Sequence, residues 1–290
     1  MNSLTSRFLP ITLAAFMGLG VILPVQAAEE PQNPAQEPGV TVATSTAAAE
    51  NQNPRLQNSY VEAGGDYLRL TNNFGSWSGG YMRATLSTPT DVWNGEINGQ
   101  REFGDAGVFA ALGDSHTFNS DWYGSVTVGS SAGGFFWPRY RLDGFINRKA
   151  LRRKQWITSA GFGYYAAKDA HRDRSFALGS TYYFDRPWVL EAGLRFNISN
   201  PGAVFSPSGF VAVTEGREKH HYLVVRLGMG VEAYQLVGAS NTLTNFQSRT
   251  LTVTWRRWVG KNWGFNLVGD YYGNPSYTRA GSTLGIFKNF

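Results

Sequence analysis

The chain lacks cysteine, has few charged residues, and carries no long hydrophobic run beyond its N-terminus. Without cysteine it has no disulfide, no thiolate metal ligand, no cysteine nucleophile and no lipidated cysteine. Charged residues make up only 16% of the 290 residues, which is low for a soluble domain. A membrane-spanning helix needs about 20 consecutive apolar residues, and none follows the N-terminus. The absences therefore argue against a soluble enzyme and a helical membrane protein.

Aromatic residues make up 14% of the chain, and between turn-forming residues apolar and polar side chains alternate. In the segment 250–256, Leu251, Val253 and Trp255 share one face, whereas the threonines and Arg256 share the other. A strand separates these residues cleanly, and a helix would scatter them. The outer face of a soluble sandwich would be charged. An apolar face that alternates with a polar one is typical of an outer-membrane β-barrel.

This alternation predicts an all-β fold, a transmembrane antiparallel β-barrel of about 14 strands over residues 59–290, with 12 or 16 strands left open. The expected strands are 59–71, 77–88, 91–102, 106–117, 121–130, 136–147, 154–167, 173–184, 187–198, 207–215, 218–231, 247–258, 262–273 and 277–290. The longest connection is expected from Tyr234 to Phe246. Aromatic girdles are expected at the strand ends, from Trp77, Trp122, Trp137, Trp156, Trp188, Trp258 and Trp263.

Residues 1–27 have the pattern of a signal peptide: Arg7, an apolar stretch over 8–23, and the small-x-small site that ends at Ala27. An N-terminal membrane anchor is the alternative. Residues 28–58 are rich in Pro, Ala, Gln and Thr without an aromatic, so we expect a disordered periplasmic leader. These features place the barrel in the outer membrane of a Gram-negative cell. An even strand number would leave both termini in the periplasm.

The chain ends on an aromatic residue, Phe290, five positions after Gly285. This ending resembles the insertion signal that the barrel-assembly machinery reads, so that machinery is an expected partner. Lys288 departs from the signal, which has an aromatic there. The ending and the tyrosine-rich segment 60–67 resemble the YaiO-type outer-membrane β-barrel family over about 59–290. Related barrels are similar to domains of exopolysaccharide export proteins, so the resemblance implies export and a periplasmic export partner.

The polar strand faces are expected to line the lumen. Their charged residues are Glu62, Asp66, Arg83, Glu96, Arg139, Arg141, Asp143, Glu191, Arg195, Arg226, Arg256, Asp270 and Arg279. They either order solutes in a polar conduit or pair across strands and brace a narrow barrel. The signs nearly cancel, which argues against strong ion selectivity.

The densest charge is the basic cluster Arg148–Lys154. It is either a solvated turn or a site for phospholipid headgroups, an anionic polymer or a periplasmic partner. The net charge of +5 is otherwise spread along the chain, so nucleic acid is not an expected partner.

Enzymatic chemistry finds little support. Ser115 and His116 are adjacent, but neighbouring side chains on a strand point to opposite faces, and the same holds for His220 and His221. No catalytic site, metal or cofactor is expected. The sequence thus favours a monomeric channel or export conduit for a polar solute or polysaccharide. A structural or partner-docking barrel is the first alternative, and an outer-membrane lipid-modifying enzyme is the second.

Overall fold

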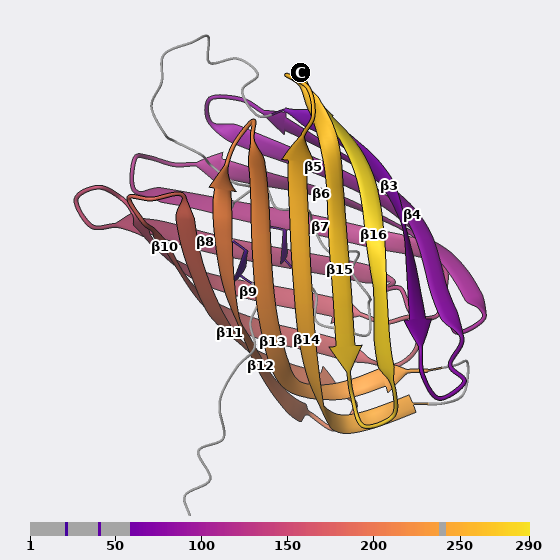
Figure 1. Ribbon diagram of the computed structural model, residues 1–290. Coiled ribbons are helices and arrows are strands. Elements are labelled where there is room, and N and C mark those ends of the chain that lie inside the picture. The colour runs from indigo at the N-terminus through magenta and orange to yellow at the C-terminus, as the bar shows by residue number, and fades with distance from the viewer. Residues whose placement is uncertain (1–20, 23–39, 42–58, 238–241) are drawn as a thin grey trace, which may run out of the picture.

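The computed structural model describes residues 21–22, 40–41, 59–237 and 242–290. Its main body is a closed barrel in which each strand pairs antiparallel with the next and the last strand pairs with the first (Figure 1). The fourteen strands are Tyr60–Leu70 (β3), Ser76–Ser87 (β4), Asp91–Glu102 (β5), Asp105–Thr117 (β6), Trp122–Gly133 (β7), Tyr140–Ala150 (β8), Trp156–Ala166 (β9), Arg172–Tyr183 (β10), Trp188–Asn200 (β11), Val204–Arg217 (β12), His221–Leu236 (β13), Thr242–Trp258 (β14), Trp263–Gly273 (β15) and Thr278–Asn289 (β16).

Only short pieces of the expected signal peptide and leader are described. Val21–Ile22 (β1) and Val40–Thr41 (β2) pair in parallel as a separate small sheet. The other residues of 1–27 and 28–58 lie outside the described residues, so both segments stay predictions. Within the described part of the chain, no helix is long and apolar enough to cross a bilayer.

The alternation explains the barrel because each strand presents one face to the lumen and one to the outside. On β14, Leu251 and Trp255 are exposed on the outer face, whereas Thr252, Thr254 and Arg256 are buried inside. The expected tryptophan girdle is only partly on the outer face. Trp122, Trp156, Trp188 and Trp263 are exposed, but Trp77, Trp137 and Trp258 are buried.

Strands β16 and β3 close the barrel, and both lie beside the labelled C-terminus (Figure 1). The backbone N–H of Phe290 donates to the carbonyl of Ser59 (3.1 Å), so the first and last described residues of the barrel meet at one end. We call this the terminal end and the opposite one the far end. Gly285 of β16 faces Gly64 of β3 in the register.

Gly285 and Gly64 leave room for the ring of Tyr81, which reaches across β3 from β4. A Cβ at Gly285 would collide with the Tyr81 hydroxyl and lie 3.0 Å from Glu62 Oε1. Gly285, which is predicted to belong to an assembly signal, has a packing role at the closing seam.

Replacing Gly285 with alanine is expected to lower the free energy of unfolding by about 1–3 kcal/mol, because the new methyl overpacks the seam. Urea titration of the barrel in detergent, followed by tryptophan fluorescence, measures this. Adding Tyr81→Phe should recover part of the loss, since without the hydroxyl the nearest ring atom, Cζ, lies 3.3 Å away. Gly95→Ala is the matched control because no atom lies within 4 Å of its built Cβ. Equal effects of G285A and G95A would contradict the packing role.

The predicted strand number is confirmed, but several strand boundaries differ, among them those of β8, β13 and β14. β8 begins at Tyr140 rather than 136, because Gly133 and Gly134 adopt positive φ and Pro138 interrupts the ladder. Arg139, predicted to line the lumen, is therefore an exposed residue of the β7–β8 loop. The expected long loop from Tyr234 to Phe246 is also wrong, because β13 continues to Leu236 and β14 starts at Thr242.

Candidate functional site

All predicted lumen charges except Arg139 lie on the inward faces of strands, and most are buried. The structure brings them together in three groups, two on the wall around β3–β5 and β14–β16, and one on the wall around β8–β13. Each group joins residues that are distant in sequence, which alternation alone does not reveal.

The first group, the seam network, lies near the terminal end and centres on Glu62. Its Oε2 lies 2.7 Å from Arg256 Nη1, and its Oε1 accepts from the Tyr81 hydroxyl (2.7 Å) and Asn266 Nδ2 (3.2 Å). The Arg256 guanidinium also lies 3.6 Å from the ring centroid of Phe287. The network links β3 and β4 to β14, β15 and β16, and so spans the strand pair that closes the barrel.

The second group continues this wall toward the far end. Arg279 of β16 pairs with Asp270 of β15 (2.7 Å), and Gln100 of β5 donates to Asp66 of β3 (3.1 Å). Gln100 crosses β4 at Gly79, where a Cβ would collide with its amide. On the lumen side, these contacts join β15 to β16, and β3 to β5 across β4.

The third group lies on the opposite wall. Arg141 Nε donates to Asp143 on the same strand (2.6 Å), and Arg195 of β11 lies 3.7 Å from that carboxylate. The Arg226 guanidinium lies 3.8 Å from the ring centroid of Phe210. Glu191 is buried on the same wall. On the wall around β3–β5, Arg83 of β4 faces Glu62 in the register and pairs with Glu96 of β5 at 3.0 Å. Acids and bases are thus interleaved, as the near cancellation of signs predicts.

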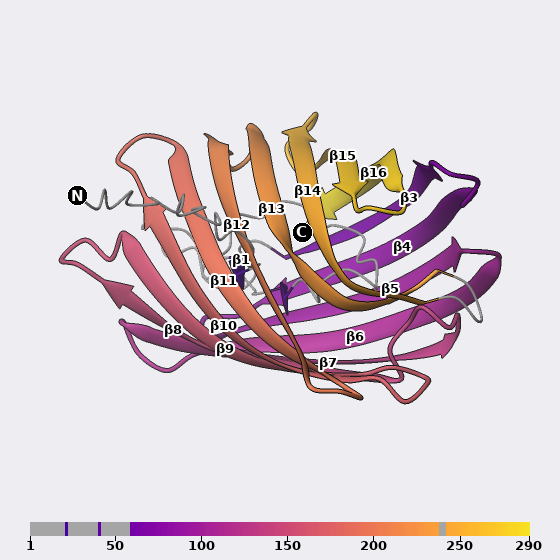
Figure 2. The same cartoon turned by 90° about the horizontal axis from the view of Figure 1, so that it is seen from below.

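At the far end, β13 and β14 continue beyond the barrel wall. β12 pairs with β13 only as far as Gly230, and β15 pairs with β14 only from Arg249. Residues 231–237 and 242–248 therefore form a two-stranded extension, which we call the mouth ribbon. Figures 1 and 2 show it turning sideways across the far end, toward β3–β5.

Hydrogen bonds hold the mouth ribbon to the β15–β16 side of the opening. Glu232 accepts from the Tyr272 hydroxyl (2.9 Å), and Gln235 contacts both the Tyr277 hydroxyl (2.5 Å) and Asn274 Nδ2 (3.1 Å). All three partners lie on β15 or in the turn that follows it. The ribbon is therefore fixed across the mouth by side chains rather than by the sheet.

Apolar packing adds to this attachment. Val237 of the ribbon is buried with Leu68 and Leu70 of β3, Trp77 of β4 and Tyr272 of β15. Leu243, Phe74 and Phe103 pack around this cluster, and Trp77 and Phe103 meet edge to face with ring centroids 5.0 Å apart. This cluster of aromatic and aliphatic side chains narrows the far mouth on the β3–β5 side.

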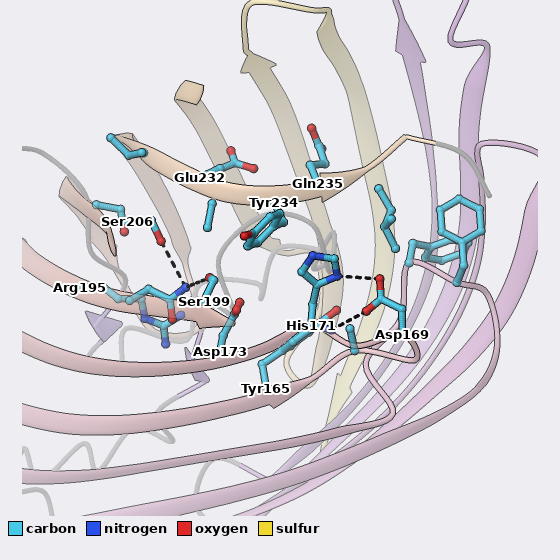
Figure 3. A pocket seen from close by; sticks show the side chains of 18 residues that line it. Tyr165, Asp169, His171, Asp173, Arg195, Ser199, Ser206, Glu232, Tyr234 and Gln235 are labelled. Atoms are coloured by element: carbon cyan, nitrogen blue, oxygen red, sulfur yellow. Dashed lines mark hydrogen bonds and ion pairs between the residues drawn. The ribbon is translucent and has the colours of Figure 1, made fainter. Parts of the chain in front are cut away.

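A pocket remains on the other side of the mouth, between the ribbon and the β9–β12 wall (Figure 3). Aromatic, acidic, hydroxyl and amide side chains line it, among them Phe135, Phe136, Tyr165, Asp169, His171, Asp173, Arg195, Asn197, Ser199, Ser206, Ser208, Glu232, Tyr234 and Gln235. Its residues come from several separated segments. Only Arg195 was predicted from sequence, because no local pattern marks the others.

Two aromatic residues that line this pocket come from different elements and contact each other. The ring of Tyr234 on the ribbon and the ring of His171 in the β9–β10 loop have centroids 4.3 Å apart, and the Tyr234 hydroxyl donates to the Pro201 carbonyl (2.6 Å). Asp169 positions His171: it accepts from the His171 backbone N–H (2.8 Å) and lies 2.7 Å from ring Nδ1. Although burial raises the pKa of Asp169, these His171 contacts outweigh it and the net shift is downward.

The wall of the pocket supplies polar groups. Asn197 donates to the hydroxyls of Ser199 (3.0 Å) and Ser206 (3.3 Å), and these side chains point into the pocket beside Asp173 and Arg195 (Figure 3). Neutral donors and acceptors beside aromatic rings suit a polyhydroxyl ligand, which offers both hydroxyl groups and C–H faces.

Other residues that could serve in catalysis or metal binding are not brought together. Ser115 is buried in the lumen, whereas His116 is exposed and lies 2.6 Å from Asp91. His221 contacts Glu215 (2.9 Å) and His220 (2.6 Å). Across the part of the chain that the structure describes, no three His, Cys, Asp or Glu residues are grouped as metal ligands.

The chain resembles known outer-membrane barrels in sequence and in fold. The family model of the YaiO membrane beta barrel domain matches residues 58–235, and no curated protein matches. The TodX deltaS2S3 mutant monoaromatic hydrocarbon channel is a similar solved structure, 10% identical with TM-score 0.55, over 80% of this chain and 90% of that one. The CymD monoaromatic hydrocarbon channel is 6% identical with a TM-score of 0.51, over 80% of this chain and 88% of that one.

Omp33, an outer membrane protein of Acinetobacter baumannii, is 8% identical with a TM-score of 0.50, over 80% of this chain and 99% of that one. At such identities the likeness shows a shared fold, that of outer-membrane porin and channel barrels. The family match goes further, because it covers more than half of the residues. This protein is a member of the YaiO membrane beta barrel family.

Proposed function

We propose that the barrel is a narrow channel for polar solutes of the saccharide class, with the mouth ribbon as its gate. The observation that carries this proposal is the pocket between the ribbon and the wall, where Tyr234 and His171 lie beside the hydroxyl and amide groups of Ser199, Ser206 and Asn197. A solute that enters the far mouth would meet this pocket first. In this proposal the terminal end faces the periplasm.

Polysaccharide export is the extended form of the same proposal, because a sugar chain would present the same chemistry at each unit. It requires the ribbon to move, since its contacts with Tyr277 and Asn274 cross the mouth. A lipid-modifying activity finds no support in the arrangement of Ser115 and His116, which face opposite sides of the wall.

Planar-bilayer recording of the full chain tests the channel. We expect small conductance steps, and we expect maltohexaose added on the far side to block the current in a concentration-dependent way. Absence of steps, both in this protein and in a variant without the ribbon, would instead support a structural or partner-docking barrel. The many internal ion pairs are compatible with that alternative.

Tyr234→Ala is expected to weaken block by maltohexaose about fivefold to tenfold, because an aromatic face contributes about 1 kcal/mol. Tyr234→Phe keeps the ring and removes the hydroxyl bond to Pro201, so it separates sugar contact from ribbon attachment. Tyr67→Ala is the matched control, since Tyr67 is exposed on the outer face of β3. Equal block in Y234A and Y67A would rule out Tyr234 as a sugar contact.

A further inference from the structure

The basic cluster Arg148–Lys154 lies at the terminal end, where β8 turns into β9. It continues into the neighbouring β10–β11 turn, which adds Arg186. Within the described residues, two carboxylates form salt bridges with these cations, Asp121 and Asp185. The lumen charges are not part of this surface, and its role is independent of the proposed channel.

Two of the cations are neutralised by the nearby carboxylates. Lys154 pairs with Asp121 at 3.0 Å and also donates to the Ser120 carbonyl (2.9 Å), and its bond lowers the pKa of Asp121. Arg153 pairs with Asp185. These pairs tie three adjacent turns together, and they leave the other cations of the surface available.

Arg148, Arg152 and Arg186 remain exposed, and within the described ranges none forms a salt bridge with a carboxylate, although Arg148 is close enough to Asp121 to help lower the pKa of that carboxyl. The Arg148 guanidinium lies 5.5 Å from the ring centroid of Trp122, which holds it against the outer wall. A guanidinium fork is suited to two-point binding of a phosphate. We call these three arginines the arginine triad.

The surroundings of the triad are those of a bilayer interface. Trp122, Trp156 and Trp188 are exposed on the outer faces of β7, β9 and β11, each at the strand end next to these turns. Exposed tryptophans at strand ends sit at the headgroup level of a bilayer. Leu151 and Phe184, within the same two turns, are also exposed and apolar. Apolar side chains beside unpaired arginines fit lipid better than a water-facing protein surface.

We propose that the arginine triad binds the phosphate of anionic phospholipid headgroups in the leaflet at the terminal end. The tryptophans and Leu151 would contact the adjacent acyl chains, and the guanidinium groups would contact the phosphate. Near a membrane surface, each basic residue adds to the attraction for anionic lipid, and salt weakens it. Anionic phospholipid is therefore selected over zwitterionic phospholipid at this site.

Native mass spectrometry of the full chain in detergent, titrated with dioleoylphosphatidylglycerol or dioleoylphosphatidylcholine, tests the proposal. We expect roughly tenfold tighter binding of the anionic lipid. The triple variant R148Q/R152Q/R186Q should lose most of this preference. The matched control is R69Q/R101Q/R174Q, which removes the same charge from exposed outward arginines near the far end. A heat-shift gel establishes that both variants are folded.

Two outcomes would overturn the proposal. The first is a triad variant that keeps the full preference for the anionic lipid, which would leave the basic surface to an acidic protein or polymer. The second is an equal loss in both triple variants, which would show that only net charge matters. Loss in the triad variant alone supports the site.

Discussion

Replacing Glu62 with glutamine is expected to lower the free energy of unfolding by about 3–5 kcal/mol, the cost of leaving a buried charge without its partner. Among the described contacts, Glu62 is the carboxylate that neutralises Arg256, and the Arg256 side chain is only 1% exposed. Glutamine keeps the shape but removes the charge. The same substitution also weakens the bonds from Tyr81 and Asn266, which converge on the other carboxylate oxygen.

Equilibrium unfolding in urea, with the barrel in lipid vesicles and tryptophan fluorescence as the signal, measures this effect. Adding Arg256→Gln should recover a large part of the loss, because neither charge then remains. Glu96→Gln is the control: Glu96 pairs with Arg83 between adjacent strands and is more exposed, so its replacement should cost less. If E62Q and the unaltered protein had the same urea midpoint of unfolding, the seam network would not stabilise the barrel.

Removing the mouth ribbon is expected to raise single-channel conductance severalfold. Val231 and Gln247 are direct partners in the β13–β14 register, so residues 232–246 can be replaced by Asn-Gly, which favours a tight hairpin turn. The barrel wall stays intact, because pairing of β13 with β12 and of β14 with β15 lies outside the deleted segment. The contacts of Gln235 and Val237 across the mouth are lost.

Conductance in planar bilayers at one salt concentration checks this prediction. A milder variant, Q235A/Y277F, removes the Gln235 bonds to Tyr277 and Asn274 and keeps the Glu232–Tyr272 bond, so it should raise the open probability while the fully open conductance stays the same. Thr71→Ala is the control, since among the described hydrogen bonds this residue bonds Thr278 at the start of β16 and none joins it to the ribbon. Unchanged conductance after removal of residues 232–246 would show that the ribbon does not obstruct the path.

The sequence was most informative where the barrel imposes a two-residue period. Each wall strand must face lipid on one side and lumen on the other, so Leu251 and Arg256 could be assigned to faces without a structure. The mouth ribbon does not follow this two-residue period. Residues 232–236 and 242–246 are paired as strands, but they leave the wall, so their side chains no longer follow the lipid and lumen alternation that marks wall strands.

The candidate site was far less predictable. Glu62 and Arg256 could each be assigned to the lumen, but they are 194 positions apart, and only closure of the barrel brings them into contact. The pocket depends on loops, where backbone geometry rather than side-chain pattern decides position. His171 and Tyr234 meet because the β9–β10 loop and the ribbon converge on one side of the mouth.

The seam network also has a consequence for closure of the barrel between β16 and β3. Glu62 lies on the first barrel strand, and its partners Arg256 and Asn266 lie on β14 and β15, so in an unclosed intermediate these two residues are apart from Glu62. A slip of one residue between β16 and β3 would turn Glu62 toward lipid. Closure in the correct register therefore gives the buried Arg256 its carboxylate partner, whereas Arg83 already faces Glu62 across β3 and β4, so we expect the pairing to favour the correctly closed barrel.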